Sequence, residues 1–279
     1  MRNFKKQIPK DSISQTDWRS NGLRAGMKGK NWAWLGLLLL LSSPTLYAQV
    51  SLQDSSISLV TLDLRYRGML PAGPMAERWG YTSTLGVEVG YQFENGWFLT
   101  AGTSFLFSDA VEIDGILDPL LVDGLLVTDN GLLTEARALG QGLLVPLTLG
   151  YILPVGPRPN PNSGFFVQIG GQYLRYRFFI EPIEEDVAGL SGEYRKGYDH
   201  LVSGLGVSQA IGYRYFDNRS YINFHLGLEL SQNVTRYQRS VHFATGVPPQ
   251  DLRADLLFGF FAGWTFPLYQ RAPNRVYYY

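Results

Sequence analysis

The sequence predicts an all-β fold, an eight-stranded antiparallel transmembrane β-barrel, and three observations lead to it. Eight segments alternate apolar and polar side chains at every second position, which is the period of a β-strand. The connections between the segments are alternately long and short. Aromatic residues gather where segments meet the short connections, while charged residues share the opposite face.

The first four segments span about 57–67, 84–93, 97–108 and 143–153. Their apolar faces consist of Val60, Leu62, Leu64 and Tyr66; of Leu85, Val87, Val89, Tyr91 and Phe93; of Trp97, Leu99, Ala101, Thr103, Phe105 and Phe107; and of Val145, Leu147, Leu149, Tyr151 and Leu153. Pro146 falls on the polar face of the fourth segment. Because proline cannot donate a ladder hydrogen bond, it predicts a bulge or an irregular pairing there.

The last four segments span about 164–177, 201–215, 222–230 and 253–266. Their apolar faces consist of Phe165, Val167, Ile169, Gly171 and Tyr173; of Leu205, Val207, Ile211, Tyr213 and Tyr215; of Ile222, Phe224, Leu226, Leu228 and Leu230; and of Leu256, Phe258, Phe260, Ala262, Trp264 and Phe266. Gln209 interrupts the apolar face of the sixth segment, which predicts a local irregularity. Each segment is long enough to cross a bilayer, since about 9 to 11 tilted residues suffice.

The connections predict which rim of the barrel each loop occupies. Short turns cover 94–96, 154–163 and 216–220, whereas long loops cover 68–83, 109–142, 178–200 and 232–252. Short periplasmic turns and long extracellular loops are typical of outer-membrane barrels. Both chain ends then fall on the periplasmic rim. Ten strands remain an alternative if loop 109–142 contributes a hairpin to the wall.

The apolar face is predicted to point outward, toward lipid. Tyr and Trp rings are typical of membrane interfaces, and they cluster at one end of the segments. The opposite face carries Asp63, Arg65, Glu88, His225 and Glu229, and an arginine facing lipid at mid-depth costs roughly 2 to 4 kcal/mol. We therefore expect ion pairs inside a lumen that its own side chains fill, with no open pore. A soluble lipocalin-like barrel, with the apolar face buried, is the alternative.

Residues 1–48 are predicted to be a signal peptide. Lys28 and Lys30 precede a short apolar core at 32–41, and cleavage is expected after Ala48, as in secretion signals. Met27 is an alternative start of translation. The chain has no cysteine, so neither a lipid-attachment cysteine nor a disulfide is expected.

The mature segment 49–279 is predicted to be a single outer-membrane β-barrel domain with a short periplasmic C-terminal tail after Phe266. Residues 1–48 contain eight of the 24 basic residues and two of the 24 acidic ones, which leaves 16 basic and 22 acidic residues in 49–279. The resulting net charge of about −6 argues against nucleic-acid binding, which requires a basic surface.

Several short motifs are similar to the strands of known barrels. They are the stretch 143–151 (LLVPLTLGY), the pair Gly170-Gly171 and the stretch 204–207 (GLGV). On these motifs the chain resembles the small outer-membrane β-barrel proteins of Gram-negative bacteria, of the OmpA type or the Por-secretion type. We expect a monomer whose partners are outer-membrane lipid and the barrel assembly machinery. Such barrels usually end on an aromatic residue of the last strand, whereas here thirteen residues follow Phe266.

Two sets of residues are candidates for chemistry. His225, Glu229 and Ser231 lie on one face of a strand, which suggests an acyl hydrolase as an alternative function. The favoured interpretation places His225 in the internal ion-pair network. Six acidic residues of loop 109–142 raise the alternative of calcium binding, but their spacing does not fit an EF-hand. They are Asp109, Glu112, Asp114, Asp118, Asp123 and Asp129.

The favoured interpretation of loop 109–142 is a hairpin above the membrane, because its Asp-Gly and Asn-Gly pairs are turn formers. Its leucines have no obvious core to enter, so the loop is also a candidate surface for a protein partner. We expect no catalytic residue, cofactor or metal. The predicted function is a non-enzymatic outer-membrane protein, structural or secretion- or surface-associated.

Overall fold

The computed structural model describes residues 58–113, 115–155, 160, 162–183, 187–217 and 223–268. These residues belong to one of the chain's two compact units, Ala48–Tyr279. The predicted signal peptide, its cleavage site and the tail 269–279 lie outside the described residues.

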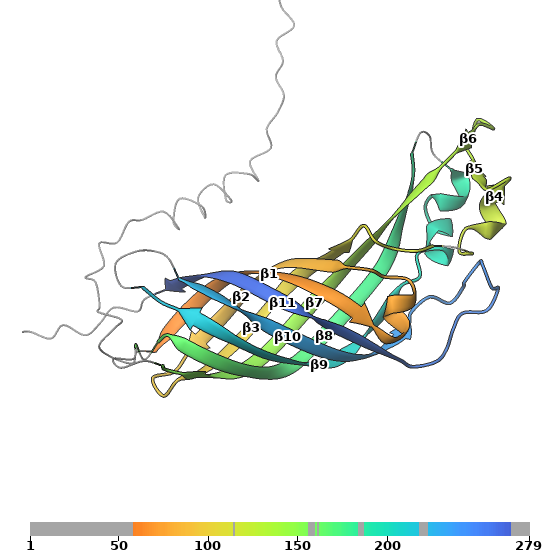
Figure 1. Ribbon diagram of the computed structural model, residues 1–279. Helices are drawn as coiled ribbons and strands as arrows, with labels where there is room; N and C mark the ends of the chain where they lie inside the picture. Colours follow the sequence, from red (N-terminus) through yellow and green to blue (C-terminus); the bar gives the residue numbers. More distant parts are fainter. Residues whose placement is uncertain are drawn as a thin grey trace, which may run out of the picture. The chain divides into compact units, whose positions relative to one another are not determined.

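Eight long strands close into an antiparallel barrel (Figure 1). They are β1 (Leu59–Ala72), β2 (Thr82–Gln92), β3 (Trp97–Ser108), β7 (Ala136–Leu153), β8 (Gly164–Pro182), β9 (Val202–Tyr215), β10 (Phe224–Tyr237) and β11 (Arg253–Leu268). The order around the wall is β1-β11-β10-β9-β8-β7-β3-β2. Each strand therefore pairs with its neighbours in this series, and β1 closes the ring against β11. The predicted eight-stranded fold is confirmed.

Loop 109–142 adds no strand to this wall. Its strands β4 (Leu121–Val122), β5 (Leu125–Val127) and β6 (Leu133–Thr134) form a separate sheet of order β4-β5-β6, preceded by the short helix η2 (Asp118–Leu120). Strands of two or three residues cannot cross a bilayer, which requires about 9 to 11. Among the described residues, the ten-strand alternative is therefore wrong.

The pairing registers determine the width of the barrel. A path that follows the paired residues from strand to strand once around the barrel starts on β1 at Leu62 and comes back to β1 at Ala72. A stagger of ten residues over eight strands corresponds to a strand tilt of about 40°. An interior of this size is just wide enough to be filled by side chains.

The wall strands extend further on the long-loop side than the sequence predicts. β7 begins at Ala136 and β8 ends at Pro182, whereas the apolar pattern indicates 143 and 177. β10 likewise continues to Tyr237 instead of ending near 230. Above the bilayer both faces of a strand contact water or loops, so the apolar alternation that marks a lipid-facing strand ends before the hydrogen-bonded ladder does.

The two predicted irregularities have different outcomes. The β3–β7 ladder is interrupted between the pairs Ala101–Leu147 and Ser104–Leu144, which is where Pro146 lies. Pro146 cannot donate to β3, so irregular pairing is confirmed, although the register is the same on both sides of the gap. The prediction at Gln209 is wrong, because its pairing with Leu230 belongs to an uninterrupted β9–β10 ladder.

The outward-facing side chains of the barrel are apolar and its inward-facing ones are largely polar. Leu147 and Phe258 are 56% and 52% exposed, whereas Arg65 and Glu88 are 0% and 1% exposed. This arrangement confirms the predicted orientation and excludes a soluble lipocalin-like barrel, which would bury the apolar face.

Aromatic rings form a girdle at the short-turn rim. Trp97 packs against Tyr151 with ring centroids 5.3 Å apart, and Phe165 packs against Tyr213 at 5.4 Å. The Trp and Tyr rings suit the headgroup layer, where an apolar body and a polar edge are both solvated. No helix in the described part of the chain is long and apolar enough to span a membrane.

Candidate functional site

The middle of the lumen holds a buried ion-pair network centred on two arginines of β1. Arg67 donates to Glu88 of β2 at 2.5 Å and to Glu229 of β10 at 3.0 Å. Arg65 lies one step below it, with its Nη1 3.4 Å from Glu88. All four side chains are at most 4% exposed. Buried charges are tolerated only when they are paired, so the network links β1, β2 and β10 across the lumen.

His225 joins this network through both ring nitrogens. Arg65 Nε donates to His225 Nε2 at 3.1 Å, so Nε2 is the acceptor and the ring proton of neutral His225 lies on Nδ1. Nδ1 is 3.1 Å from Thr265 Oγ1 and 3.5 Å from Asp63 Oδ1. Thr265 in turn donates to Asp63. The favoured interpretation of His225, a partner in the internal network, is therefore confirmed.

The structure does not assemble the candidate hydrolase residues. A nucleophile needs a base within hydrogen-bond distance, but His225 contacts Arg65 and Thr265, while Glu229 accepts from Arg67. Ser231 accepts from Asn233 Nδ2 at 3.1 Å. Alternation along β10 brings the three residues to the lumen, but the six positions between His225 and Ser231 span about 20 Å of strand.

An aromatic layer fills the periplasmic end of the lumen. Phe98 meets Phe166 edge to face at 5.7 Å, and Phe166 lies 6.1 Å from Phe261. The buried Arg214 places its guanidinium 4.5 Å from the ring of Phe98 and 5.7 Å from that of Phe166. Cation–π contacts of this kind stabilise a desolvated arginine. Arg214 was not among the candidate residues, and its alternation on β9 is the signal that could have indicated it.

A second polar layer lies above the arginines, toward the long loops. Gln172 donates to Asn233 at 2.7 Å. Tyr176 and Thr235 both donate to Asp255, each at 2.6 Å. These bonds tie β8, β10 and β11 together across the lumen.

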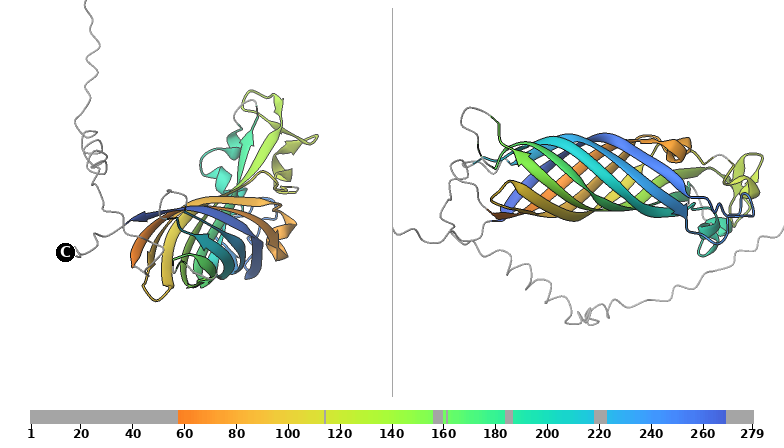
Figure 2. Two further views of the ribbon diagram at one scale, coloured as in Figure 1. Left: turned by 60° about the vertical axis from the view of Figure 1, so that its left-hand side comes forward. Right: turned by 90° about the horizontal axis from the view of Figure 1, so that it is seen from below.

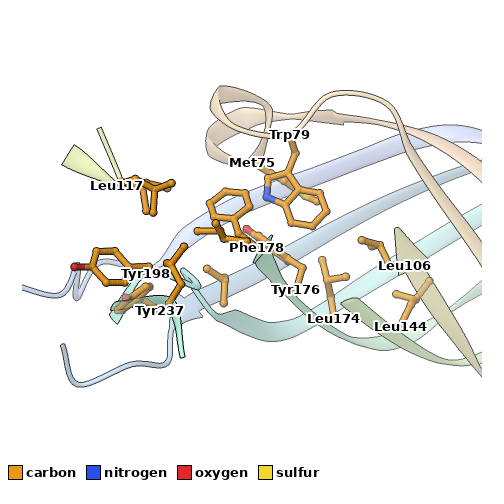
Figure 3. Packing of buried hydrophobic residues seen from close by; sticks show 14 of the residues in the cluster. Met75, Trp79, Leu106, Leu117, Leu144, Leu174, Tyr176, Phe178, Tyr198 and Tyr237 are labelled. Carbon is orange, nitrogen blue, oxygen red and sulfur yellow. The ribbon is translucent and has the colours of Figure 1, made fainter. Parts of the chain in front are cut away.

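An apolar layer fills the extracellular end of the lumen, and the sequence did not predict it. The connection between β1 and β2 folds its short helix η1 (Gly73–Glu77) so that Met75 and Trp79 are buried. Figure 3 shows both side chains over Tyr176 and Phe178 of β8. Trp79 stacks on Phe178 with centroids 5.8 Å apart and meets Tyr176 edge to face at 5.1 Å. We call Met75 and Trp79 the plug.

Gly140 of β7 is what allows the plug to seat. A Cβ atom at this position would lie 2.4 Å from Cζ3 of Trp79 and 2.6 Å from its Cη2, which is too close for any real contact. The signal that the sequence did offer was a tryptophan and a methionine in a loop otherwise rich in polar residues, glycine and proline. Such residues are mostly buried, so they could have indicated a loop that folds inward.

A pair of histidines borders the apolar layer, outside the membrane-spanning strands. His200 and His242 have ring centroids 5.7 Å apart, and His200 Nε2 lies 3.3 Å from Nη1 of Arg253. Burial, then the positive charge of Arg253, lowers the pKa of His200 from 6.5 to about 3. Burial also lowers the pKa of His242, with Arg78 as the second cause. Both rings are therefore neutral near pH 7.

Above the rim, two long loops form what we call the extracellular lobe, residues 109–139 and 178–200 (Figures 1 and 2). The lobe contains the β4–β6 sheet with η2, and the short helices η3 (Ala188–Leu190) and η4 (Tyr194–Gly197). Asp123 and Gly124 have φ values of 52° and 82°. Two positive φ values in a two-residue connection are typical of a type I′ hairpin turn, so the turn-forming role predicted for Asp-Gly is confirmed here.

The acidic residues of the lobe that the structure describes do not assemble a metal site. Among the described residues no group of three or more His, Cys, Asp or Glu is placed to hold a metal ion; Asp114 lies outside them. Asp129 Oδ1 accepts from the backbone N–H of Ala188 at 2.7 Å, joining the two loops. Asp118 begins η2, and Asp123 forms the hairpin turn.

The apolar residues of the lobe divide between a core and an exposed face. Ile116, Leu117 and Leu126 are buried in a cluster that continues into the apolar layer of the lumen, so the expectation that the leucines have no core is wrong for these residues. The opposite face of the β4–β6 sheet is exposed. Val122 is 53%, Val127 37% and Leu133 50% exposed.

An open groove of about 240 Å³ runs beside this exposed face. It is lined by Leu125, Leu133, Thr134, Glu135 and Ile183. Ile183 follows β8 and is 60% exposed, and its backbone N–H donates to the carbonyl of Glu135 at 3.0 Å. The groove therefore lies where the small sheet joins the arm formed by β7 and β8.

No family model matches the chain, and no curated protein matches it. Solved structures are similar to it at low identity. The attachment invasion locus protein Ail of Yersinia pestis, in complex with a heparin analogue, is 10% identical, with 75% of this chain and 99% of Ail covered and a TM-score of 0.37. The N-terminal β-barrel domain of Pseudomonas aeruginosa OprF is 11% identical, with 75% and 100% covered and a TM-score of 0.33.

Neisserial surface protein A is 9% identical, with 74% of this chain and 96% of that protein covered and a TM-score of 0.34. At these identities and scores, no residue role passes from those proteins to this chain. The closed wall, the lipid-facing exterior and the buried ion pairs are features of the chain itself, and they are those of an eight-stranded outer-membrane β-barrel protein.

Proposed function

We propose that this protein is a monomeric, non-enzymatic surface component of the outer membrane, whose extracellular lobe binds another protein. The observation that carries the proposal is the exposed apolar face of the β4–β6 sheet, formed by Val122, Val127 and Leu133. Exposed apolar patches on an ordered surface are typical of interaction sites.

The lumen supports the non-enzymatic part of this proposal. Its titratable side chains near mid-depth are engaged with one another, as in the pairs Arg67–Glu229 and Arg65–His225. Side-chain layers lie on both sides of this network, with Phe98 and Phe166 below it and the plug above it. A substrate would have to displace one of these layers to reach His225.

Site-specific crosslinking in intact cells tests the binding role. A photoreactive amino acid at Val122 should give a crosslinked species heavier than the monomer, because Val122 lies on the exposed face. The additional substitution Leu133→Ser should abolish this species. The same photoreactive residue at Leu252, which is 71% exposed in the loop between β10 and β11, is the matched control. If Val122 gives no heavier species, the binding role is refuted.

The lipid A acylation profile tests the absence of enzymatic activity. Ser231→Ala removes the only hydroxyl of the candidate triad, and His225→Gln removes its base. Cells carrying either variant should show the same lipid A species as cells with the natural chain. A changed acylation pattern at equal barrel abundance would establish an enzyme and remove this part of the proposal.

A further inference from the structure

The lobe groove has a chemical character that points to one class of occupant. We infer that it takes a cationic, apolar segment of another protein; this inference rests on the proposed function and specifies its partner. The groove walls supply the apolar contacts, and acidic side chains beside them supply the charge preference.

The apolar surface is continuous around the groove. Leu125 pairs with Val122 and Leu133 pairs with Val127 across the small sheet, so these four side chains share the exposed face. Ile183 closes the groove from the side of β8. A groove of about 240 Å³ accommodates a few apolar side chains, which favours a short segment over a broad, flat interface.

The charges that stretch 109–135 brings to this surface have one sign. The stretch 109–135 contains seven acidic residues and no lysine, arginine or histidine. Glu135 lines the groove, and Asp123 forms the turn that follows Val122. Both are exposed. On the adjoining arm, the basic Arg137 lies opposite the acidic Glu181 in the β7–β8 ladder.

An acidic rim selects among occupants by electrostatic complementarity. It attracts basic partners and accelerates their association, whereas a like-charged surface is repelled. A second copy of this lobe would bring the same acidic stretch against itself, and anionic lipid headgroups carry the same sign. A basic segment with two or three apolar side chains satisfies both the groove and its rim.

A defined peptide tests this inference on the whole barrel. The full mature chain would be placed in phosphatidylcholine nanodiscs and titrated against a short fluorescein-labelled peptide composed of leucine and lysine. A peptide with glutamate in place of each lysine is the charge control, and empty nanodiscs give the background. Fluorescence anisotropy should show binding of the lysine peptide to the barrel alone, and this binding should weaken as salt rises.

Paired variants separate the apolar contribution from the charge contribution. Val127→Ser with Leu133→Ser should weaken peptide binding about ten-fold or more, because two apolar contacts are lost. Asp123→Asn with Glu135→Gln should weaken it about three-fold at low salt and less at high salt. Asparagine tolerates the positive φ of position 123, so the hairpin turn is retained.

Matched controls lie on the same rim, in the loop between β10 and β11. Val247→Ser with Leu252→Ser removes two exposed apolar side chains, and Asp251→Asn removes one exposed charge. None of these changes should alter peptide binding. Heat-modifiable migration on gels would verify that every variant still forms a closed barrel.

The possible outcomes distinguish a failure of this inference from a failure of the proposed function. Equal binding of the lysine and glutamate peptides, or binding unaffected by the Val127 and Leu133 substitutions, would overturn the inference. If Val122 still crosslinks to a partner in cells, the binding role stands without it. A crosslinked species of twice the monomer mass would identify a second copy as the occupant and would overturn the inference also.

Discussion

The barrel wall and the extracellular lobe both expose apolar side chains, but their surroundings differ. Outside the barrel, Leu147 and Phe258 face acyl chains, so their exposure costs nothing. Above the rim, Val122 and Leu133 face water, which makes exposure of their apolar surface unfavourable. Burial in the bilayer therefore accounts for the exposed apolar side chains of the wall. It does not account for those of the lobe, which the proposed protein partner would cover.

A second contrast concerns charge. The lumen buries Arg67 between Glu88 and Glu229, whereas the lobe keeps Glu193 and Lys196 in a solvated pair. The same pairing chemistry therefore has different consequences. In the lumen the partners have no water to replace a lost contact, while in the lobe water replaces it at once.

The largest expected effect sharpens this contrast. Glu88→Leu leaves Arg65 and Arg67 buried with less compensation, so we expect a loss of about 3 to 5 kcal/mol in the free energy of unfolding. Urea unfolding of the barrel in lipid vesicles measures it. Glu193→Ala, which breaks the exposed pair with Lys196, should have no measurable effect. Equal losses in the two variants would mean that the lumen network is solvated.

The next effect concerns the histidine pair between lumen and lobe. Burial lowers the pKa of His200 from 6.5 to about 3. Between these two pH values the ring is therefore neutral in the folded state and protonated in the unfolded state. The stabilisation is complete above pH 6.5 and is lost as the pH falls toward 3, by about 2 kcal/mol at pH 5.

Hydrogen exchange of segment 187–202 measures this pH dependence. The protection factors, which are exchange rates corrected for the pH-dependent intrinsic rate, should fall between about pH 7 and pH 5, because protonation of His200 favours the open state. His200→Gln removes the titrating ring and should flatten the dependence. Protection factors that do not change with pH in the natural chain would show that His200 is solvated, in conflict with its burial.

The smallest expected effect concerns the plug. Gly140→Ala places a Cβ against Trp79, so either the ring or the strand must shift, at a cost of about 1 to 2 kcal/mol. Gly171→Ala is the matched control, since its Cβ would meet no atom closer than 3.9 Å. Only the first variant should lower the unfolding temperature. Equal behaviour of the two variants would place Trp79 away from β7.

Much of the wall could be predicted because lipid imposes its pattern on the sequence. A strand with acyl chains on one side and a polar lumen on the other must alternate at every second residue, and this alternation identified β2, β3 and β9 within two residues at each end. The pattern weakened above the bilayer, so the upper ends of β7, β8 and β10 were missed. The Asp123-Gly124 turn was recognisable because few residues adopt positive φ.

The lumen partners could not be predicted in the same way. Polar residues were correctly assigned to the interior, but the pairing of Arg65 with His225 joins residues 160 positions apart. Such a contact depends on the stagger of the barrel, and a change in register would give each arginine a different partner. The separation of Ser231 from His225, by contrast, follows from their spacing along β10, since six residues of a strand span about 20 Å.

The sequence by itself determined where the wall strands lie within the bilayer and which face meets lipid, because these follow from a local period and from the solubility of each side chain. The structure was needed to exclude ten strands. Only the tertiary structure decided that Trp79 fills the extracellular end of the lumen, that Arg67 joins Glu88 to Glu229, and which lobe residues are buried. These contacts join segments distant in the chain, and barrel closure alone brings them within bonding distance.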